Sequence, residues 1–260
     1  MTMQSNAQNI SEKFSGQVYI VLPAFNEGRS LPKLFRCIDD NMKSVALDYR
    51  VVIVDDGSTD DTFDVIEEFS KTMPVAAIRH NVNLGLGAAI RDGLAFAAGA
   101  AKDGDIIITM DADDTHSPDL ILRMTEMIRK DFDVVIASRF RKGSRVVGVP
   151  FYRRVLSRMA SVLFRLVLPI KGVKDFTCGY RAYRAEAIKK ALSRYGENFF
   201  TRSGFECMVD ILLRLRKMNL VFGELPIVLR YDYKEGQTKM KITRTVANTL
   251  LLLLKRKFHP

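Results

Sequence analysis

The first half of the chain alternates between short apolar runs and longer amphipathic segments. Five runs are apolar on both faces and rich in β-branched residues, which predicts buried strands at residues 17–23, 50–54, 74–78, 106–110 and 134–137. The segments between them place apolar residues at helical spacing, which predicts helices at 30–45, 59–70, 86–101 and 118–130. Strands of this kind, separated by helices, indicate an α/β fold with a mostly parallel sheet flanked by helices.

The second half follows a different pattern. It predicts helices at 152–168, 184–192 and 204–218, of which the first is basic, amphipathic and ends before Pro169. Loops are expected at 175–179 and 236–240, and a strand with a break at Pro226 is expected at 220–229. We therefore expect a flexible N-terminal segment at 1–16, one α/β domain at 17–240 and a C-terminal amphipathic helical region at 241–260.

The C-terminal region contains five leucines at 250–254, followed by Lys255, Arg256 and Lys257. An apolar stretch closed by a basic cluster is typical of a helix that lies in a membrane interface. A core helix whose cationic end complements the helix dipole has the same pattern, so both interpretations stay open.

Composition and charge indicate the size of the domain and the kind of partner. The 260 residues are 47% hydrophobic, which suits one large domain or two small ones. Residues 1–138 carry 13 Lys and Arg against 22 Asp and Glu, a net charge of −9, whereas residues 139–260 carry 27 against 8, a net charge of +19. A basic half indicates an anionic partner, with a solvated basic surface as the alternative. Nucleic acid is disfavoured, because the aromatic residues are not interleaved with the arginines.

The cysteines indicate a reducing compartment. Cys37, Cys178 and Cys207 are far apart and show no metal-ligand spacing. The polar first residues lack the apolar core of a signal peptide, and no apolar run is long enough to span a bilayer. We therefore expect a cytoplasmic protein, placed peripherally on the cytoplasmic face of a membrane if the basic half binds lipid.

Polar clusters follow the carboxyl ends of four predicted strands. These clusters are Asn26-Glu27, Asp55-Asp56-Gly57-Ser58, Asn83-Leu84-Gly85 and Asp111-Ala112-Asp113. Parallel sheets bind ligands at this edge, and Asp111 and Asp113 can converge on one Mg²⁺ or Mn²⁺ whose other ligands are substrate phosphates. A helix-capping turn is the alternative for that pair, but four clusters at one edge favour a binding site. The site is not a dinucleotide fingerprint, because Ile90 takes the place of the third glycine, and no Walker lysine is present.

These clusters, in their order along the chain, resemble the motifs of family 2 glycosyltransferases. The motifs are Pro23-Ala24-Phe25-Asn26-Glu27, Val54 to Ser58, Asn83-Leu84-Gly85, Asp111-Ala112-Asp113 and Ser138-Arg139-Phe140. Three further segments, Arg153 to Ser157, Asp175 to Arg181 and Gly236 to Met240, resemble dolichol-phosphate mannosyltransferases and their bacterial polyprenyl-phosphate relatives. The resemblance covers residues 17 to 245. It implies a GT-A fold, a nucleotide-sugar donor and a polyprenyl phosphate acceptor at a membrane surface.

Carried over by position, the resemblance also implies roles for single residues. Pro23, Phe25, Glu27 and Asp55 are expected to hold the nucleoside, with Asp111 and Asp113 binding the metal and the diphosphate. Arg139, Arg153 and Ser157 are expected to hold the lipid phosphate, with Lys239 near the phosphates. Asp113 and Arg139 are the residues that we expect to act in catalysis.

The chain departs from the family in three ways. Thr115 stands where the family often has Gln, which leaves Asp114 or a water as the third metal ligand. Thr238 replaces a usual Ser, and the transmembrane segments of many relatives are absent, which leaves open whether a membrane-protein partner supplies an anchor. Of the histidines, His116 is expected to stabilise Asp113, whereas His80 shows no role.

The residues leave three functions to compare. An inverting transfer of a hexose, with mannose from GDP-mannose preferred, needs no general base when the acceptor is a phosphate, because the phosphate is already an anion. A UDP-sugar donor or a hydroxyl acceptor is the alternative, and a hydroxyl acceptor would need Glu206 as base. A non-catalytic membrane-associated adaptor is the third possibility, against which the acidic edge argues.

Overall fold

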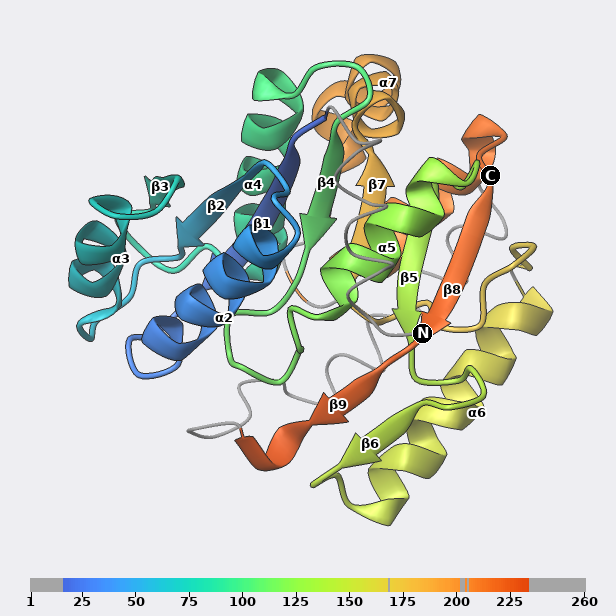
Figure 1. Cartoon of the computed structure of the whole chain (residues 1–260). Helices are drawn as coiled ribbons and strands as arrows, with labels where there is room; N and C mark the ends of the chain where they lie inside the picture. The colour runs from blue at the N-terminus through green and yellow to red at the C-terminus, as the bar shows by residue number, and fades with distance from the viewer. Residues whose placement is uncertain (1–15, 168, 202–203, 205, 234–260) are drawn as a thin grey trace.

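In the computed structural model, a seven-stranded sheet forms the centre of the molecule (Figure 1). The structure describes residues 16–167, 169–201, 204 and 206–233. In spatial order the strands are β3 (Val75–Arg79), β2 (Tyr49–Asp55), β1 (Val18–Ala24), β4 (Ile106–Thr109), β7 (Arg181–Arg184), β5 (Val134–Ser138) and β8 (Phe222–Pro226). Neighbouring strands are parallel except where β7 lies antiparallel between β4 and β5. A second, two-stranded sheet pairs β6 (Arg145–Val147) with β9 (Val228–Arg230).

Helices cover both faces of the large sheet. The α-helices are α2 (Leu31–Ser44), α3 (Thr62–Ser70), α4 (Leu86–Ala100), α5 (Leu120–Arg129), α6 (Phe151–Val167), α7 (Ala185–Tyr195) and α8 (Cys207–Leu215). Short 3₁₀ turns are η1 (Gly196–Phe199), η2 (Arg216–Met218) and η3 (Tyr231–Tyr233). Figure 1 shows α2 and α5 in front of the sheet and α4 and α7 behind it, with α6 at the periphery near β6. Within the described ranges, no helix is both long and apolar enough to cross a bilayer.

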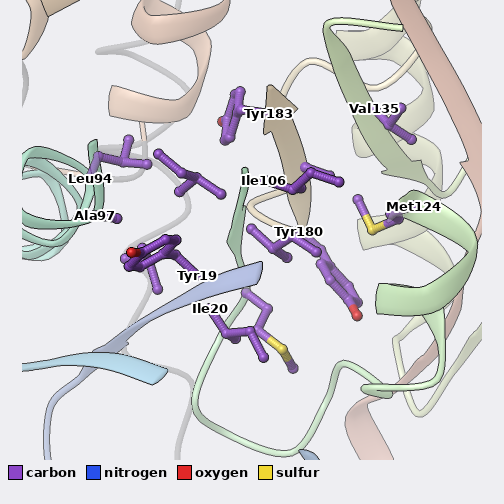
Figure 2. Close-up of a cluster of buried hydrophobic side chains, with 14 of the residues drawn as sticks. Tyr19, Ile20, Leu94, Ala97, Ile106, Met124, Val135, Tyr180 and Tyr183 are labelled. Atoms are coloured by element: carbon purple, nitrogen blue, oxygen red, sulfur yellow. The ribbon is translucent and has the colours of Figure 1, made fainter. Parts of the chain in front are cut away.

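The core is made by the apolar strands and by the helix faces that cover them. Val18, Ile20, Ile107 and Ile108 have no exposed surface, as continuous apolar runs in a covered parallel sheet require. Figure 2 shows side chains of β1, β4 and β7 meeting in this core, among them Ile20, Ile106 and Tyr183. The α/β fold class is therefore confirmed.

Most of the predicted elements are present, with shifted ends. All five strands of the first half and the four helices between them are confirmed, as is the basic helix, α6. Two features of the second half were missed. The sequence predicted no strand at β7, because four residues bounded by arginines carry little periodicity. The break expected at Pro226 is confirmed, because the proline ends β8, but the sequence did not predict that the chain then leaves the large sheet and forms β9 in a second sheet with β6. The expected loop at 236–240 and the expected helical region at 241–260 lie outside the described residues.

Arg181 of β7 is a charged side chain with no exposed surface. Its guanidinium donates hydrogen bonds to three carbonyl oxygens, those of Phe176 (2.8 Å), Cys178 (2.9 Å) and Met208 (2.7 Å). A buried charge is tolerated when its donors are satisfied in this way. Arg181 therefore fixes the loop before β7 and joins it to α8.

We expect Arg181→Met to lower the free energy of unfolding by about 3 kcal/mol, because it removes three buried hydrogen bonds from a charged donor. Urea denaturation followed by circular dichroism measures this change. Arg123→Met, at an exposed position of α5, is the matched control and should change the stability by less than about 0.5 kcal/mol. Equal losses in the two variants would contradict the role given to Arg181.

Candidate active site

The four polar clusters meet along one edge of the sheet. β1 and β2 run parallel in a register that pairs Ala24 with Asp55, and β4 runs parallel to β1 with Thr109 opposite Val21. The segments that follow these strands therefore leave the sheet on the same side. The edge predicted from the sequence exists, and the side chains on it fall into two groups. Some hold the loops in place, and others are candidates for binding a ligand.

Asn26 belongs to the first group. It has a positive φ of 52°, its backbone N–H donates to Ser58 Oγ (2.9 Å), and its side-chain oxygen accepts from the N–H of Thr59 (2.8 Å). The N–H of Glu27 donates to Thr62 Oγ1 (2.8 Å), and the Glu27 carboxylate accepts from Ser30 Oγ (3.2 Å). These contacts join the loop after β1 to the loop after β2.

Asp55 has no exposed surface, and its two carboxylate oxygens differ. Oδ1 accepts a hydrogen bond from the N–H of Ser58 (3.0 Å). Oδ2 lies 3.7 Å from Arg79 Nε and has no hydrogen-bond partner in the described part of the chain. A buried acceptor without a donor is costly, so Oδ2 is suited to accept an N–H group from a ligand such as a nucleobase.

His80 joins two carboxylates next to this position, although the sequence gave no role to it. Its Nδ1 lies 2.7 Å from Asp56 Oδ1 and its Nε2 lies 2.9 Å from Asp92 Oδ2. Asp56 also accepts the backbone N–H groups of Leu84 (2.9 Å) and Gly85 (2.8 Å). The trio therefore fixes the loop that begins α4. Sequence spacing alone could not reveal a contact between residues of three different elements.

Asp111 and Asp113 lie on the loop after β4, and their environments differ. The side chain of Asp111 is 41% exposed, whereas Asp113 is buried. Asp113 Oδ1 accepts from the hydroxyl (2.6 Å) and the N–H (3.2 Å) of Thr115. Thr115 thus orients Asp113, which is a role that the sequence comparison with Gln at this position did not indicate.

Two other expectations for this loop change. His116 contacts Asp111 instead of Asp113, because its Nδ1 accepts the backbone N–H of Asp111 (3.1 Å) and its Nε2 lies 3.8 Å from Asp111 Oδ2. The Asp114 carboxylate is ion-paired with Lys33, which makes it a poor third metal ligand. No group of three His, Cys, Asp or Glu side chains able to hold a metal occurs among residues that the structure describes. Two carboxylates on one loop still fit a hard cation whose other ligands come from a diphosphate and water.

The loop before β7 packs against Asp111. Thr109 Oγ1 donates to the carbonyl of Gly179 (2.7 Å), and a Cβ at Gly179 would lie only 3.3 Å from Asp111 Oδ1. Glycine at 179 thus leaves room beside the carboxylate. The motif from Asp175 to Arg181 therefore reaches the acidic edge.

Arg139, at the end of β5, forms a two-point ion pair with Asp175. Its Nε and Nη2 donate to the two carboxylate oxygens (2.8 and 2.7 Å), and its backbone N–H donates to Oδ2 (3.0 Å). Burial alone would raise the pKa of Asp175, but the charge and hydrogen bonds of Arg139 outweigh it and the pKa is lowered. Most of the Arg139 fork is therefore engaged, and Nη1 is the group outside this pair.

Glu224 of β8 supports the same loop. Its Oε1 accepts the backbone N–H groups of Lys174 (2.6 Å) and Asp175 (2.7 Å). Burial raises the pKa of this carboxyl group above its ordinary value. The sequence analysis missed both Asp175 and Glu224 as positioning residues, because their partners lie tens of residues away.

Tyr231 is a further residue that the sequence did not single out. The carbonyl of Thr115 accepts the N–H of Arg230 (3.3 Å), and Leu229 forms a bridge with His116. This places η3 against the acidic loop. Burial, followed by the negative charge of Asp111, raises the pKa of Tyr231. The chain thus passes the acidic loop immediately before the segment that contains Lys239, which lies outside the described residues.

The remaining predicted residues occupy separate places. Pro23 and Phe25 are partly buried at the end of β1. Arg153 and Ser157 lie one turn apart on α6, and Arg153 Nε is buried without a hydrogen-bond partner among the described residues. Glu206 is buried at the start of α8, not on a helix surface. The roles of Arg153 and Ser157 in holding a phosphate stay predictions.

The Arg139–Asp175 pair should make the free energy of unfolding fall at acidic pH. Because the folded-state pKa of Asp175 is lowered, the pair stabilises the fold at neutral pH and this contribution is lost as the pH falls through that pKa. We expect Asp175→Asn to be less stable than wild type by about 3 kcal/mol near neutral pH, with the difference shrinking below about pH 4. Urea unfolding across this pH range tests it. Asp103→Asn, at a side chain that is 85% exposed, is the control, and a difference independent of pH for Asp175→Asn would contradict the account.

The sequence of this chain is similar to a family model and to several proteins from other organisms. The model of glycosyl transferase family 2 matches residues 19–192. A dolichol-phosphate mannosyltransferase of Pyrococcus furiosus is 32% identical over 226 residues, 86% of this chain and 59% of that protein, so the chain spans about three fifths of its length. A polyprenol monophosphomannose synthase of Mycolicibacterium smegmatis is 32% identical over 85% of this chain and 80% of its own.

Solved structures share the fold at lower identity. Glucosyl-3-phosphoglycerate synthase from Mycobacterium tuberculosis, crystallised with Mn²⁺, UDP and glucosyl-3-phosphoglycerate, superimposes with a TM-score of 0.68 at 18% identity, covering 100% of this chain and 85% of that one. The same enzyme with Mg²⁺ and UDP gives a TM-score of 0.66 at 16% identity, covering 97% and 84%. With a family model that matches more than half of its residues and relatives at 32% identity, the chain belongs to glycosyl transferase family 2.

Proposed function

We propose that the chain transfers a hexose from a nucleotide-sugar to a polyprenyl phosphate, with mannose from GDP-mannose as the expected donor. The observation that carries the proposal is the acidic edge of the sheet, where Asp55 Oδ2 has no hydrogen-bond partner among the described residues and the side chain of Asp111 is exposed. Relatives named for the transfer of mannose to dolichol, polyprenol or undecaprenyl phosphate support the choice of acceptor.

The donor would lie along this edge. Asp55 Oδ2 can accept an N–H of guanine or of uracil, with Pro23, Phe25 and Glu27 beside the nucleoside. Asp111 and Asp113 would hold Mg²⁺ or Mn²⁺, which neutralises the charge that develops on the diphosphate leaving group. The two carboxylates suit this role because His116 and Thr115 fix their loop before any ligand arrives. A UDP-sugar is the alternative donor.

The acceptor phosphate attacks the anomeric carbon directly. One bond forms between a phosphate oxygen and this carbon as the bond to the diphosphate oxygen breaks, so the anomeric configuration inverts. Arginine suits the positioning of the phosphate because its planar fork binds two oxygens at once. Arg153 and Ser157 of α6, Lys239 and Nη1 of Arg139 are the groups proposed for this task.

A lipid acceptor places the reaction at a membrane surface. We propose that the protein acts peripherally on the cytoplasmic face, with a membrane-protein partner as a further possibility. Purified protein, polyprenyl phosphate and Mg²⁺, incubated with a panel of radiolabelled sugar nucleotides, should yield a glycolipid most rapidly with GDP-mannose. Absence of product with every donor would overturn the proposal.

Asp111→Asn and Asp113→Asn are each expected to lower kcat by about 100-fold or more, because the developing charge on the leaving group is no longer neutralised. Chelation of the metal should have the same effect on the wild type. Asp114→Asn is the matched control on the same loop, and its exposed pairing with Lys33 predicts a change of less than about threefold. An adaptor without catalysis would instead show no transfer in the wild type and no loss of its binding function in the Asp variants.

Glu206→Gln separates the two classes of acceptor. A phosphate acceptor needs no base, so this isosteric change at a buried position should leave the turnover within about threefold of the wild type. A hydroxyl acceptor that used Glu206 as base would lose about 100-fold or more. Initial rates with the best donor, together with an unchanged urea midpoint to confirm the fold, give the answer.

A further inference from the structure

Helix α6 presents a continuous apolar face to solvent. Eight of the fourteen exposed large hydrophobic side chains among the described residues belong to this one helix. Six of them recur at helical spacing and form what we call the outer face of α6: Phe151, Val155, Met159, Val162, Leu163 and Leu166. With Arg154 and Arg158 they line a surface depression of about 520 Å³. An apolar surface of this extent on one element indicates a binding surface.

The opposite face of α6 is anchored to the protein. Ser161 Oγ donates to the carbonyl of Lys174 (2.6 Å), and the ring of Phe164 stacks on Phe176 with centroids 5.1 Å apart. Arg153 and Ser157 lie on this inner side and are only partly exposed. The contacts with the loop before β7 therefore fix the rotation of the helix, so the outward direction of the apolar face is set by the fold. Figure 1 places α6 at the periphery of the molecule, where such a face can meet a large partner.

The positive charge of α6 indicates the kind of partner that its outer face binds. α6 carries four arginines and no acidic residue. Residues 234–260 carry seven Lys and Arg against one Glu, so this segment of the chain would bring like charge to the outer face. A second copy of α6 would do the same. An anionic lipid surface is complementary to both features, because it accepts apolar side chains at the acyl boundary and attracts arginines at the head groups.

We propose that the outer face of α6 docks into the interface of a bilayer that contains anionic lipid, with the helix lying in the membrane plane. The biological purpose of this docking depends on the proposed function, the transfer of a hexose to a lipid phosphate. A protein docked through this face places Arg153 and Ser157 near the membrane surface from which a polyprenyl phosphate emerges. The two residues lie about half a turn around the same helix from the outer face. It assigns the membrane contact to residues within the α/β domain and not to the C-terminal region alone.

Vesicle co-sedimentation of the full chain tests the proposal without donor or acceptor. The probes are phosphatidylcholine vesicles with and without phosphatidylglycerol. The Met159→Glu, Leu166→Glu double variant is expected to bind anionic vesicles at least about tenfold more weakly, because two apolar anchors become charged. Phe96→Glu, an exposed apolar position on α4, is the matched control and should bind as the wild type does. Arg154→Gln with Arg158→Gln should weaken binding to anionic vesicles about tenfold and leave binding to neutral vesicles unchanged.

Three outcomes would overturn the docking surface. Equal binding by the α6 variants and the Phe96→Glu control would show that another segment, such as residues 234–260, makes the membrane contact. A wild-type dimer in sedimentation velocity that the α6 variants convert to a monomer would show that a second copy covers the face. Loss of the circular dichroism spectrum in Leu166→Glu alone would show that the residue packs in the fold. Because the vesicles contain no polyprenyl phosphate, a failure of the transfer reaction leaves this result untouched, and the two proposals fail separately.

Discussion

The insertion of β7 between β4 and β5 is the constraint on which the site depends. An antiparallel strand begins where its parallel neighbours end, so the residues that lead into β7 arrive at the carboxyl end of β4. This brings Gly179 beside Asp111 and, through Arg181, ties the same loop to α8. If β4 and β5 paired directly, the loop that contains Gly179 would not lie beside Asp111. The charge separation seen along the sequence becomes a contact because one short strand runs against the others.

Carboxylates at the edge divide into clamps and candidate ligands. Asp56, Asp113, Asp175 and Glu224 accept backbone N–H groups and hold loops in fixed shapes. A buried carboxylate needs such donors, and each of these four residues has at least one carboxylate oxygen satisfied in this way. Asp55 Oδ2, which lacks a hydrogen-bond partner among the described residues, and the exposed side chain of Asp111 are candidate ligands, and Asp113 combines its contact with Thr115 with the proposed place at the metal. Preformed loops reduce the reorganisation that a transition state would require, and such preorganisation is usually a large contribution to enzyme catalysis.

The basic half is organised around one helix with two faces. The inner face of α6 contacts the loop that also carries the Arg139–Asp175 pair, and the outer face is apolar and exposed. A single rigid element therefore lies between the acidic edge of the sheet and the proposed membrane surface. For a lipid acceptor this is a physical advantage, because the phosphate and the prenyl chain need opposite environments within a few ångströms of each other.

The sequence by itself determined the α/β class, the order of the first-half elements and the edge on which the polar clusters lie. Apolar runs with helices between them permit few other folds, and local periodicity is a property of neighbouring residues. Tertiary structure alone decided the place of β7, the His80 bridge between Asp56 and Asp92, and the pairing of Arg139 with a carboxylate that the sequence analysis had not linked to it. These features join residues far apart in the chain, and a hydrogen bond between distant residues leaves no periodic signal in one sequence. The motif Asp111-Ala112-Asp113 could be recognised from the sequence, but only the fold showed that Thr115 orients the Asp113 carboxylate and that His116 holds the backbone of Asp111.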